Sequence, residues 1–171
     1  GDPKFDALQT LTDENKIHLR EAFRLKEGTP VWIAGSTHAG EEEIILNAHQ
    51  QLREKHPGLV LILAPRRIER INEVAALLEK KNISFARRSS LEHAESTILL
   101  DTMGELAAVY SLGQVAFIGR SLIEPGGGHS LIEPLSHGLT VMHGPHIENI
   151  GPIADEAHTR GLAFTVHNAE E

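Results

Sequence analysis

Four short segments of the sequence carry side chains and glycines that could bind an anionic ligand. Each follows an apolar run: GSTHAG at residues 35–40, PRR at 65–67, DTMG at 101–104, and residues 120–129. Arginine matches phosphate in a two-point geometry, glycine lets a ligand approach the backbone, and a helix start favours negative charge. These segments together indicate a site for a phosphate-containing ligand.

The first segment continues as GSTHAGEEE over residues 35–43 and leaves two interpretations open. In one, Gly35, Ser36 and Thr37 form a loop whose free N–H groups face an anion at a helix start. In the other, Ser36 or Thr37 contributes to a cap while the three glutamates complement the helix dipole. The segment is neither a GxxxxGK[ST] loop nor a GxGxxG fingerprint, and it lacks the second histidine of a zinc-protease helix.

The second segment supplies the cation of the predicted site. Arg66 follows almost directly after an apolar run, so we expect its guanidinium to face the ligand. A surface ion pair with Glu69 or Glu73 is the alternative, and we adopt that alternative for Arg67 and Arg70.

The third segment reads DTMGE over residues 101–105 and has the character of a turn that enters a helix. Glu105 would lie near the positive end of that helix, and Met103 could pack in the core. Taken alone, this segment identifies no ligand.

The fourth segment contains PGGGHSLIEP at residues 125–134. Residues 130–133 fit the S-x-x-E capping box, although Pro134 could place the helix start near Glu133 instead. The glycines let a ligand approach the backbone, and Glu133 could accept hydrogen bonds from a ribose diol. Capping alone is the competing interpretation.

Short apolar runs alternate with segments of helical periodicity along the chain. The runs are apolar throughout, which is typical of strands covered on both faces, so we predict a Rossmann-like α/β fold with a mostly parallel sheet. Ligands bind outside the carboxyl ends of such strands, so the four segments should meet at one edge. We expect strands at residues 30–35, 59–64, 84–87, 97–100, 115–119, 139–142 and 162–166, helices at 13–26, 41–55, 69–81, 105–112, 131–137 and 150–160, and a polar surface loop at 87–95.

Composition excludes several function classes. The 171 residues are 40% hydrophobic and 23% charged, which predicts one domain with a sizeable core. A net charge of −8 and 4% aromatic residues argue against a nucleic-acid surface. The chain has no cysteine, its eleven histidines match no metal spacing, and we predict no metal. No apolar run approaches the roughly 20 residues that span a bilayer.

Taken together, the motifs resemble those of the bacterial 3-deoxy-D-manno-octulosonic acid (Kdo) transferases, the lipid A Kdo transferase family. The order and spacing of the matches are specific, and they cover nearly the whole chain. The matching stretches are GDPKFD from Gly1, GSTHAGEEE from Gly35, LVLILAPRR from Leu59, DTMGEL from Asp101, VAFIGRSL from Val115, GGHSLIEPLSHG from Gly127 and GPHIENI from Gly144.

The resemblance implies the C-terminal half of a two-domain GT-B glycosyltransferase, with residues 1–171 forming the domain that holds the donor CMP-Kdo. It implies that the parent enzyme transfers Kdo to a lipid A precursor in lipopolysaccharide biosynthesis, at the cytoplasmic face of the bacterial inner membrane and without a cofactor. The N-terminal acceptor domain, with its catalytic glutamate, and the final C-terminal helices are expected outside this chain. We therefore expect a soluble donor-binding fragment without turnover.

The resemblance also assigns residues. The family's CMP contacts fall by position on Pro65, Arg66, Met103, Gly104, Glu105, Ser130, Leu131, Ile132 and Glu133. The residues alone add Gly35, Ser36, Thr37, Gly127, Gly128 and His129 as candidate phosphate or sugar contacts. The chain departs from the family at residues 130–133, where Asn-Pro-Leu-Glu is usual, and in having three glycines before His129 where two are usual.

Two alternatives stay open beside this interpretation. One is another GT-B enzyme, a transferase or epimerase that uses a UDP- or ADP-sugar. The other is a non-catalytic interaction domain whose loops are only helix caps.

Overall fold

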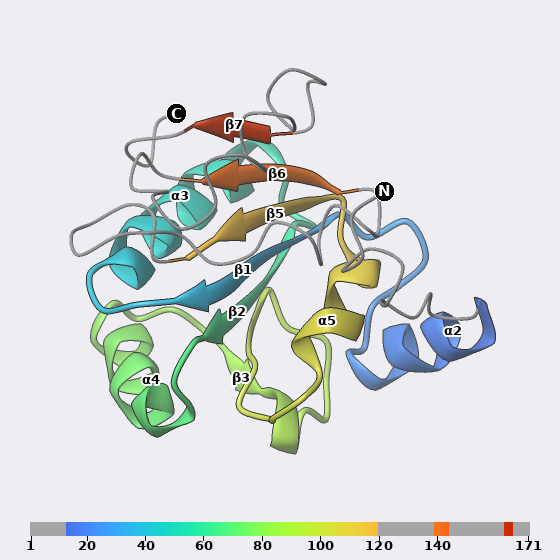
Figure 1. Cartoon of the computed structure of the whole chain (residues 1–171), viewed down its shortest axis with the longest axis horizontal. Coiled ribbons are helices and arrows are strands. Elements are labelled where there is room, and N and C mark those ends of the chain that lie inside the picture. Colours follow the sequence, from blue (N-terminus) through green and yellow to red (C-terminus); the bar gives the residue numbers. More distant parts are fainter. Residues whose placement is uncertain (1–12, 120–138, 144–162, 166–171) are drawn as a thin grey trace, which may run out of the picture.

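The computed structural model describes residues 13–119, 139–143 and 163–165, which form a parallel β-sheet with helices on both faces (Figure 1). Its seven strands are arranged in the order β3-β4-β2-β1-β5-β6-β7, and every pair is parallel. The predicted α/β class is therefore confirmed. The strands are β1 (Val31–Thr37), β2 (Val60–Pro65), β3 (Ala86–Arg87), β4 (Thr97–Leu99), β5 (Val115–Ile118), β6 (Thr140–His143) and β7 (Ala163–Thr165).

Successive side chains of each central strand enter opposite cores. In β1, Ile33 belongs to one buried cluster and Trp32 to the other. The first cluster packs beneath α2 (Asp13–Ala22) and α5 (Leu106–Val109), and the second beneath α3 (Glu41–Lys55) and α4 (Ile71–Lys80). Figure 1 shows α3 and α4 on the left and α2 and α5 on the right. Burial on both faces explains why these strands are continuously apolar.

The expected helices are found with some differences at their ends. Helix α3 has the predicted bounds, whereas residues 68–70 form a 3₁₀ helix before α4, and residues 110–112 form another after α5. The first helix ends at Ala22 rather than at residue 26, because Arg24 takes a left-handed conformation with φ 57° that no helix accommodates. The helices expected at residues 131–137 and 150–160 lie outside the described residues.

The polar surface loop expected at residues 87–95 is confirmed for its second part, where residues 91–95 form no helix or strand and residues 92–94 are exposed. In its first part, Arg87 belongs to β3 and the 3₁₀ helix Arg88–Ser90 follows at once, and Leu91 is 8% exposed. Leu91 joins the cluster beneath α2 and α5, so this residue anchors an otherwise largely exposed segment to the domain.

The strand order reverses beside β1. After β1 the chain adds β2, β3 and β4 on one side of it, and then β5, β6 and β7 on the other side. Parallel α/β sheets bind ligands outside the carboxyl ends of the strands at such a switch point. The carboxyl ends of β1, β2, β4 and β5 therefore define the edge where a site is expected.

A buried histidine connects helix α3 to the sheet. The indole Nε1–H of Trp32 donates to Nδ1 of His49 at 3.0 Å, and Nε2 of His49 lies 3.1 Å from the carbonyl oxygen of Ser96, to which it donates. His49 is 2% exposed, and burial lowers its pKa to about 4. The neutral tautomer with the proton on Nε2 satisfies both contacts, so His49 is uncharged in the folded protein.

We expect the stability of the fold to depend on pH through the lowered pKa of His49. Because the folded pKa lies below the ordinary value, the unfolded chain binds the extra proton first, and stability falls as pH decreases from about 6.5 toward 4. We expect the stability advantage of the parent chain over His49→Gln to shrink by about 2 kcal/mol between pH 7.5 and pH 5. Urea unfolding at the two pH values measures this difference. An advantage that does not change with pH would mean that His49 protonates normally in the folded state.

Candidate functional site

Backbone hydrogen bonds join the carboxyl ends of the three central strands. The N–H of Arg66, just after β2, donates to the carbonyl oxygen of Thr37 at 2.9 Å. On the other side of β1, the N–H of Gly119 donates to the carbonyl oxygen of Gly35 at 2.8 Å. The segments that the sequence singles out after β1 and β2 are therefore adjacent.

Strand β1 ends in a bulge at Ser36. The pairing with β2 shifts between Gly35 and Thr37, and Ser36 has a φ of 56°, a strained conformation for a non-glycine residue. Gly119 makes room for the bulge, because a Cβ there would lie 2.0 Å from the carbonyl oxygen of Ser36. Strain of this kind clusters at ligand sites, and here it turns Ser36 toward a cavity.

That cavity, of about 370 Å³, lies across the carboxyl ends of β1, β2 and β4. Its volume falls within the range of small-molecule sites. It has a cationic part at Arg66 and Arg67 and an apolar part at Ile68 and Met103. The complete lining is Ser36, Ala64, Pro65, Arg66, Arg67, Ile68, Glu69, Leu100, Thr102, Met103, Gly104 and Leu106. Five of the predicted site residues, Ser36, Pro65, Arg66, Met103 and Gly104, therefore share one cavity.

The three arginines after β2 differ in their partners. Arg67 lies 3.8 Å from Glu69, and Arg70 donates to Glu42 at 2.9 Å and to Glu73 at 3.1 Å. The two contacts raise the pKa of Arg70, mainly through its hydrogen bond to Glu42. The expectation that Arg67 and Arg70 pair with acidic neighbours is thus confirmed. Arg66 forms no side-chain hydrogen bond or ion pair with any described residue, and its side chain is exposed at the cavity.

The turn after β4 supplies the opposite wall. Gly104 has a φ of 81°, a conformation that favours glycine, and Met103 before it is 82% exposed, so it does not pack in the core. Glu105 does not line the cavity. Its carboxylate accepts a hydrogen bond from the hydroxyl of Thr102 and lies 3.4 Å from Arg88.

The predicted anion loop at residues 35–37 takes a different form. Gly35, Ser36 and Thr37 belong to β1, and the hydroxyl of Thr37 is buried with no hydrogen-bond partner among the described residues. Neither Ser36 nor Thr37 caps α3, whose N-cap is Gly40. The carboxylate of Glu41 instead accepts the backbone N–H of His38 at 3.0 Å. The N–H of His38 thus has an acidic partner within the protein, while contact of Gly35, Ser36 or Thr37 with an anion stays a prediction.

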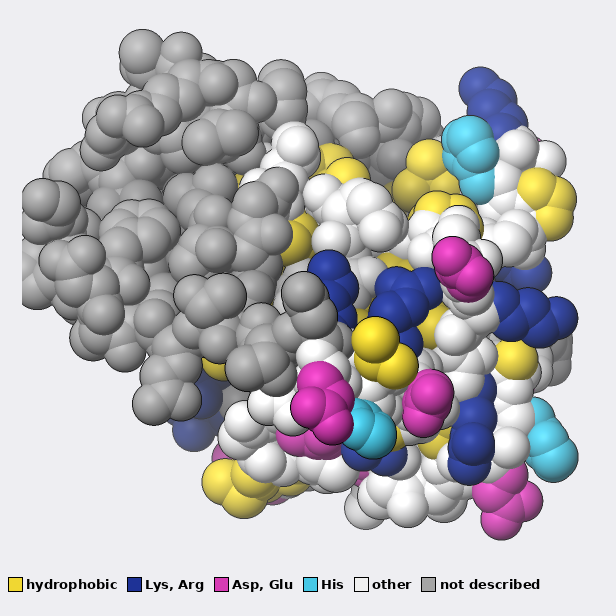
Figure 2. Space-filling model, turned by 90° about the vertical axis from the view of Figure 1, so that its right-hand side faces the viewer, with side chains coloured by type: hydrophobic (Ala, Val, Ile, Leu, Met, Phe, Trp, Pro, Cys, Tyr) yellow, Lys and Arg dark blue, Asp and Glu magenta, His cyan; other side chains and the backbone are white. Residues whose placement is uncertain are grey.

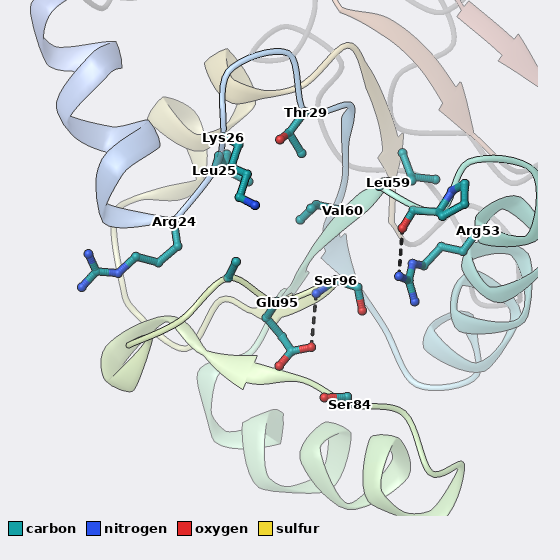
Figure 3. A pocket seen from close by; sticks show the side chains of 13 residues that line it. Arg24, Leu25, Lys26, Thr29, Arg53, Leu59, Val60, Ser84, Glu95 and Ser96 are labelled. Atoms are coloured by element: carbon teal, nitrogen blue, oxygen red, sulfur yellow. Dashed lines mark hydrogen bonds between the residues drawn. The ribbon is translucent and has the colours of Figure 1, made fainter.

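A second cavity, of about 480 Å³, lies at the opposite edge of the sheet, where the strands start (Figure 3). Val60, the first residue of β2, and Ser96, which directly precedes β4, both line it. Two of its charged side chains are bonded: Arg53 donates to the carbonyl oxygen of Pro57 at 2.9 Å, and Glu95 accepts the N–H of Ser96. The side chains of Arg24 and Lys26 also line this cavity, and neither forms a hydrogen bond or ion pair with a described residue. Figure 2 shows basic and acidic side chains interspersed over the described part of the face from which the strands start. Unpaired cations therefore occur at both edges, and the cavity at Arg66 is distinguished by its place at the carboxyl ends of the strands, where parallel sheets bind ligands.

The remaining predicted site residues lie outside the described residues. They are Gly127, Gly128, His129, Ser130, Leu131, Ile132 and Glu133. Within the described part of the chain, no cluster of side chains is suited to a metal ion, and no helix is both long and apolar enough to cross a membrane.

The sequence analysis missed several residues near the site, among them Thr102, Ile68 and Arg88. Thr102 and Ile68 line the cavity, and Arg88 contacts Glu105. Thr102 lies within the DTMGE motif and was overlooked because a hydroxyl in a turn has no distinctive pattern. Arg88 was assigned to a surface loop, and the apolar Leu91 three residues later was the signal that this segment is anchored to the domain.

Comparisons with known proteins identify relatives of this chain. No family model matches the chain. The chain is 46% identical over 153 residues to the 3-deoxy-D-manno-octulosonic acid transferase of Haemophilus influenzae. This alignment covers 88% of the chain and 33% of that protein. It is also 36% identical over 177 residues to the bifunctional glycosyltransferase/methyltransferase of Fusobacterium nucleatum. This second alignment covers 100% of the chain and 27% of that protein. The chain thus spans about a third or less of the length of these relatives.

A solved structure gives the same result for the fold. The crystal structure of the C-terminal CMP-Kdo binding domain of WaaA from Acinetobacter baumannii matches with a TM-score of 0.84 and 35% identity. The match covers 92% of this chain and 82% of that domain. Sequence and fold therefore agree, and the chain belongs to the 3-deoxy-D-manno-octulosonic acid transferase family.

Proposed function

We propose that this domain binds CMP-Kdo at the carboxyl edge of its sheet, with the phosphate of the donor beside Arg66. The observation that carries the proposal is the position of Arg66. Its guanidinium is unpaired among the described residues, and it lines a cavity that also contains Pro65, Met103 and Gly104. A related domain, from Acinetobacter baumannii, is described as CMP-Kdo binding.

The two parts of the cavity suit the two parts of a nucleotide. Ile68 and Met103 are 40% and 82% exposed, and they offer an apolar surface to a base. Arg66 offers a planar pair of donors to a phosphate. We keep residues 130–133 in the proposed set of donor contacts, together with Glu105, which directly follows Gly104 although it does not line the cavity itself.

In the full-length protein, we assign to this domain the stabilisation of the leaving group. A glutamate of the acceptor domain deprotonates a hydroxyl of the lipid A precursor, and that oxygen attacks the anomeric carbon of Kdo. The bond between the anomeric carbon and the phosphate oxygen breaks, and CMP departs with the electron pair. Negative charge develops on the phosphate, where Arg66 stabilises it. The reaction requires no cofactor from this domain, and we place the parent enzyme at the cytoplasmic face of the inner membrane.

A nucleotide panel tests the proposal. We expect CMP to bind the 171-residue chain and to raise its melting temperature, because a ligand that binds the folded state stabilises it. Calorimetric titration with CMP, UMP, UDP and ADP separates the alternatives. Preference for UDP or ADP over CMP would favour another class of sugar donor, and no binding of any nucleotide would favour a non-catalytic interaction domain.

A further inference from the structure

Arg88 connects a peripheral segment to the turn that lines the cavity. Its guanidinium nitrogen Nη2 donates to Oε2 of Glu105 at 3.4 Å, and its Nε lies 3.4 Å from Oε1. The Nε–H makes no hydrogen bond among the described residues, so the second contact is electrostatic. The side chains are 25% and 27% exposed, which leaves this pair partly screened from water.

Arg88 is itself held in place from the other side. Its guanidinium carbon lies 4.9 Å from the centre of the Phe23 ring, just after α2. Phe23 is 0% exposed, so the ring is a fixed surface, and a guanidinium over such a ring is attracted to it. Arg88 therefore presents its donors to Glu105 from a constrained position.

The 3₁₀ helix Arg88–Ser90 also contacts the other end of the turn, at Asp101. The backbone N–H of Ser89 donates to the carboxylate of Asp101 at 2.9 Å, and the hydroxyl of Ser89 donates to its second oxygen. Thr102 donates to the Glu105 carboxylate from within the turn. The segment Arg88–Ser90 thus fixes both ends of residues 101–105, whose middle residues Met103 and Gly104 line the cavity.

We propose that Arg88 is a positioning residue for donor binding, acting through Glu105 to hold the turn at residues 101–105 in the arrangement that lines the cavity. This inference rests on the proposed function. The inference goes beyond the proposed function because it assigns a role to Arg88, which does not line the cavity.

Two physical effects give Arg88 this role. Helix α5 is four residues long and has no side-chain cap, so it constrains the preceding turn weakly. Without Arg88, the end of the turn at Glu105 loses one of its two described side-chain contacts, and Gly104 can change its backbone conformation more easily because a glycine has many alternatives. The carboxylate of Glu105 would also lose its cationic partner and repel an approaching phosphate. Both effects weaken the binding of CMP.

The test compares neighbouring arginines in the 171-residue chain. Arg88→Met keeps the aliphatic stem beside Phe23 but removes the donors, and we expect CMP binding to weaken about 5- to 10-fold. Arg87→Met is the matched control, because Arg87 donates to Asn72 and not to Glu105, and it should leave the dissociation constant unchanged. Arg88→Lys keeps the positive charge but lacks the planar set of guanidinium donors, so it should give an intermediate dissociation constant for CMP.

A double-mutant cycle separates positioning from a general loss of stability. If Arg88 acts through Glu105, the effect of Arg88→Met on CMP binding should largely disappear in a Glu105→Gln background. An equal effect in both backgrounds overturns the inference, as does a lowered melting temperature with unchanged CMP affinity. If Arg88→Met does not fold, the same comparison is made with Arg88→Lys. Failure of the parent chain to bind CMP would instead contradict the proposed function on which the inference rests.

Discussion

Replacing Arg66 with alanine is expected to weaken CMP binding about 30-fold, because a hydrogen bond to a charged group contributes about 2 kcal/mol. Its guanidinium lines the cavity and has no partner among the described residues, so its charge is available to a ligand. The side chain is exposed, and its removal creates no internal void. We therefore expect the melting temperature of the free chain to stay nearly constant, and calorimetric titration with CMP measures the loss.

Arg67→Ala is the matched control for this prediction. Arg67 follows Arg66 and also borders the cavity, but it lies 3.8 Å from Glu69 with both side chains exposed. Its removal should weaken CMP binding much less than removal of Arg66. Equal losses for the two substitutions would indicate a general attraction between positive charge and phosphate, and would contradict a specific contact at Arg66.

Gly119→Ala should cause the largest loss of stability of the substitutions considered. A Cβ at this position would lie 2.0 Å from the carbonyl oxygen of Ser36 and 2.7 Å from the Cα of Thr37, both of them backbone atoms that cannot rotate away. Strands β1 and β5 must then separate at their carboxyl ends. We expect a loss of about 3 kcal/mol or more, measured by urea unfolding, with a melting temperature lower by roughly 6–12 °C.

Gly58→Ala provides the comparison for a glycine with open space. No atom lies within 4 Å of a Cβ built at Gly58, so alanine should leave stability unchanged or raise it slightly. If Gly119→Ala is no more harmful than Gly58→Ala, the backbones of β1 and β5 are not in the close contact described here. The bulge that turns Ser36 toward the cavity would then lack its support.

The strands that lie at the centre of the sheet were the most readable from the sequence. Strands β1 and β2 are covered on both faces, so residues 31–34 and 60–65 are continuously apolar, and this pattern identified both strands. Strand β3 is different, because it contains two residues at the edge of the sheet and both are half-buried. A short edge strand has no hydrophobic pattern of its own. Its bounds therefore depend on its pairing with β4, which the sequence does not display.

The candidate site was partly predictable for a related reason. Arg66, Met103 and Gly104 follow strands that the sequence identifies, and the rule for parallel sheets places such residues at one edge. The conformation of Ser36 was not predictable, because the bulge depends on the close approach of Gly119, 83 residues later in the chain. Arg88 was also not recognised, because its importance comes from Glu105, which is 17 residues away in the sequence. Contacts between distant segments decide both features.

The position of CMP in a crystal of this chain would test the central claim most directly. We predict that its phosphate lies within hydrogen-bond distance of the Arg66 guanidinium, in the cavity formed by Ser36, Pro65 and the turn at Met103 and Gly104. CMP bound instead at the opposite edge of the sheet, in the cavity bordered by Arg53 and Glu95, would contradict the account.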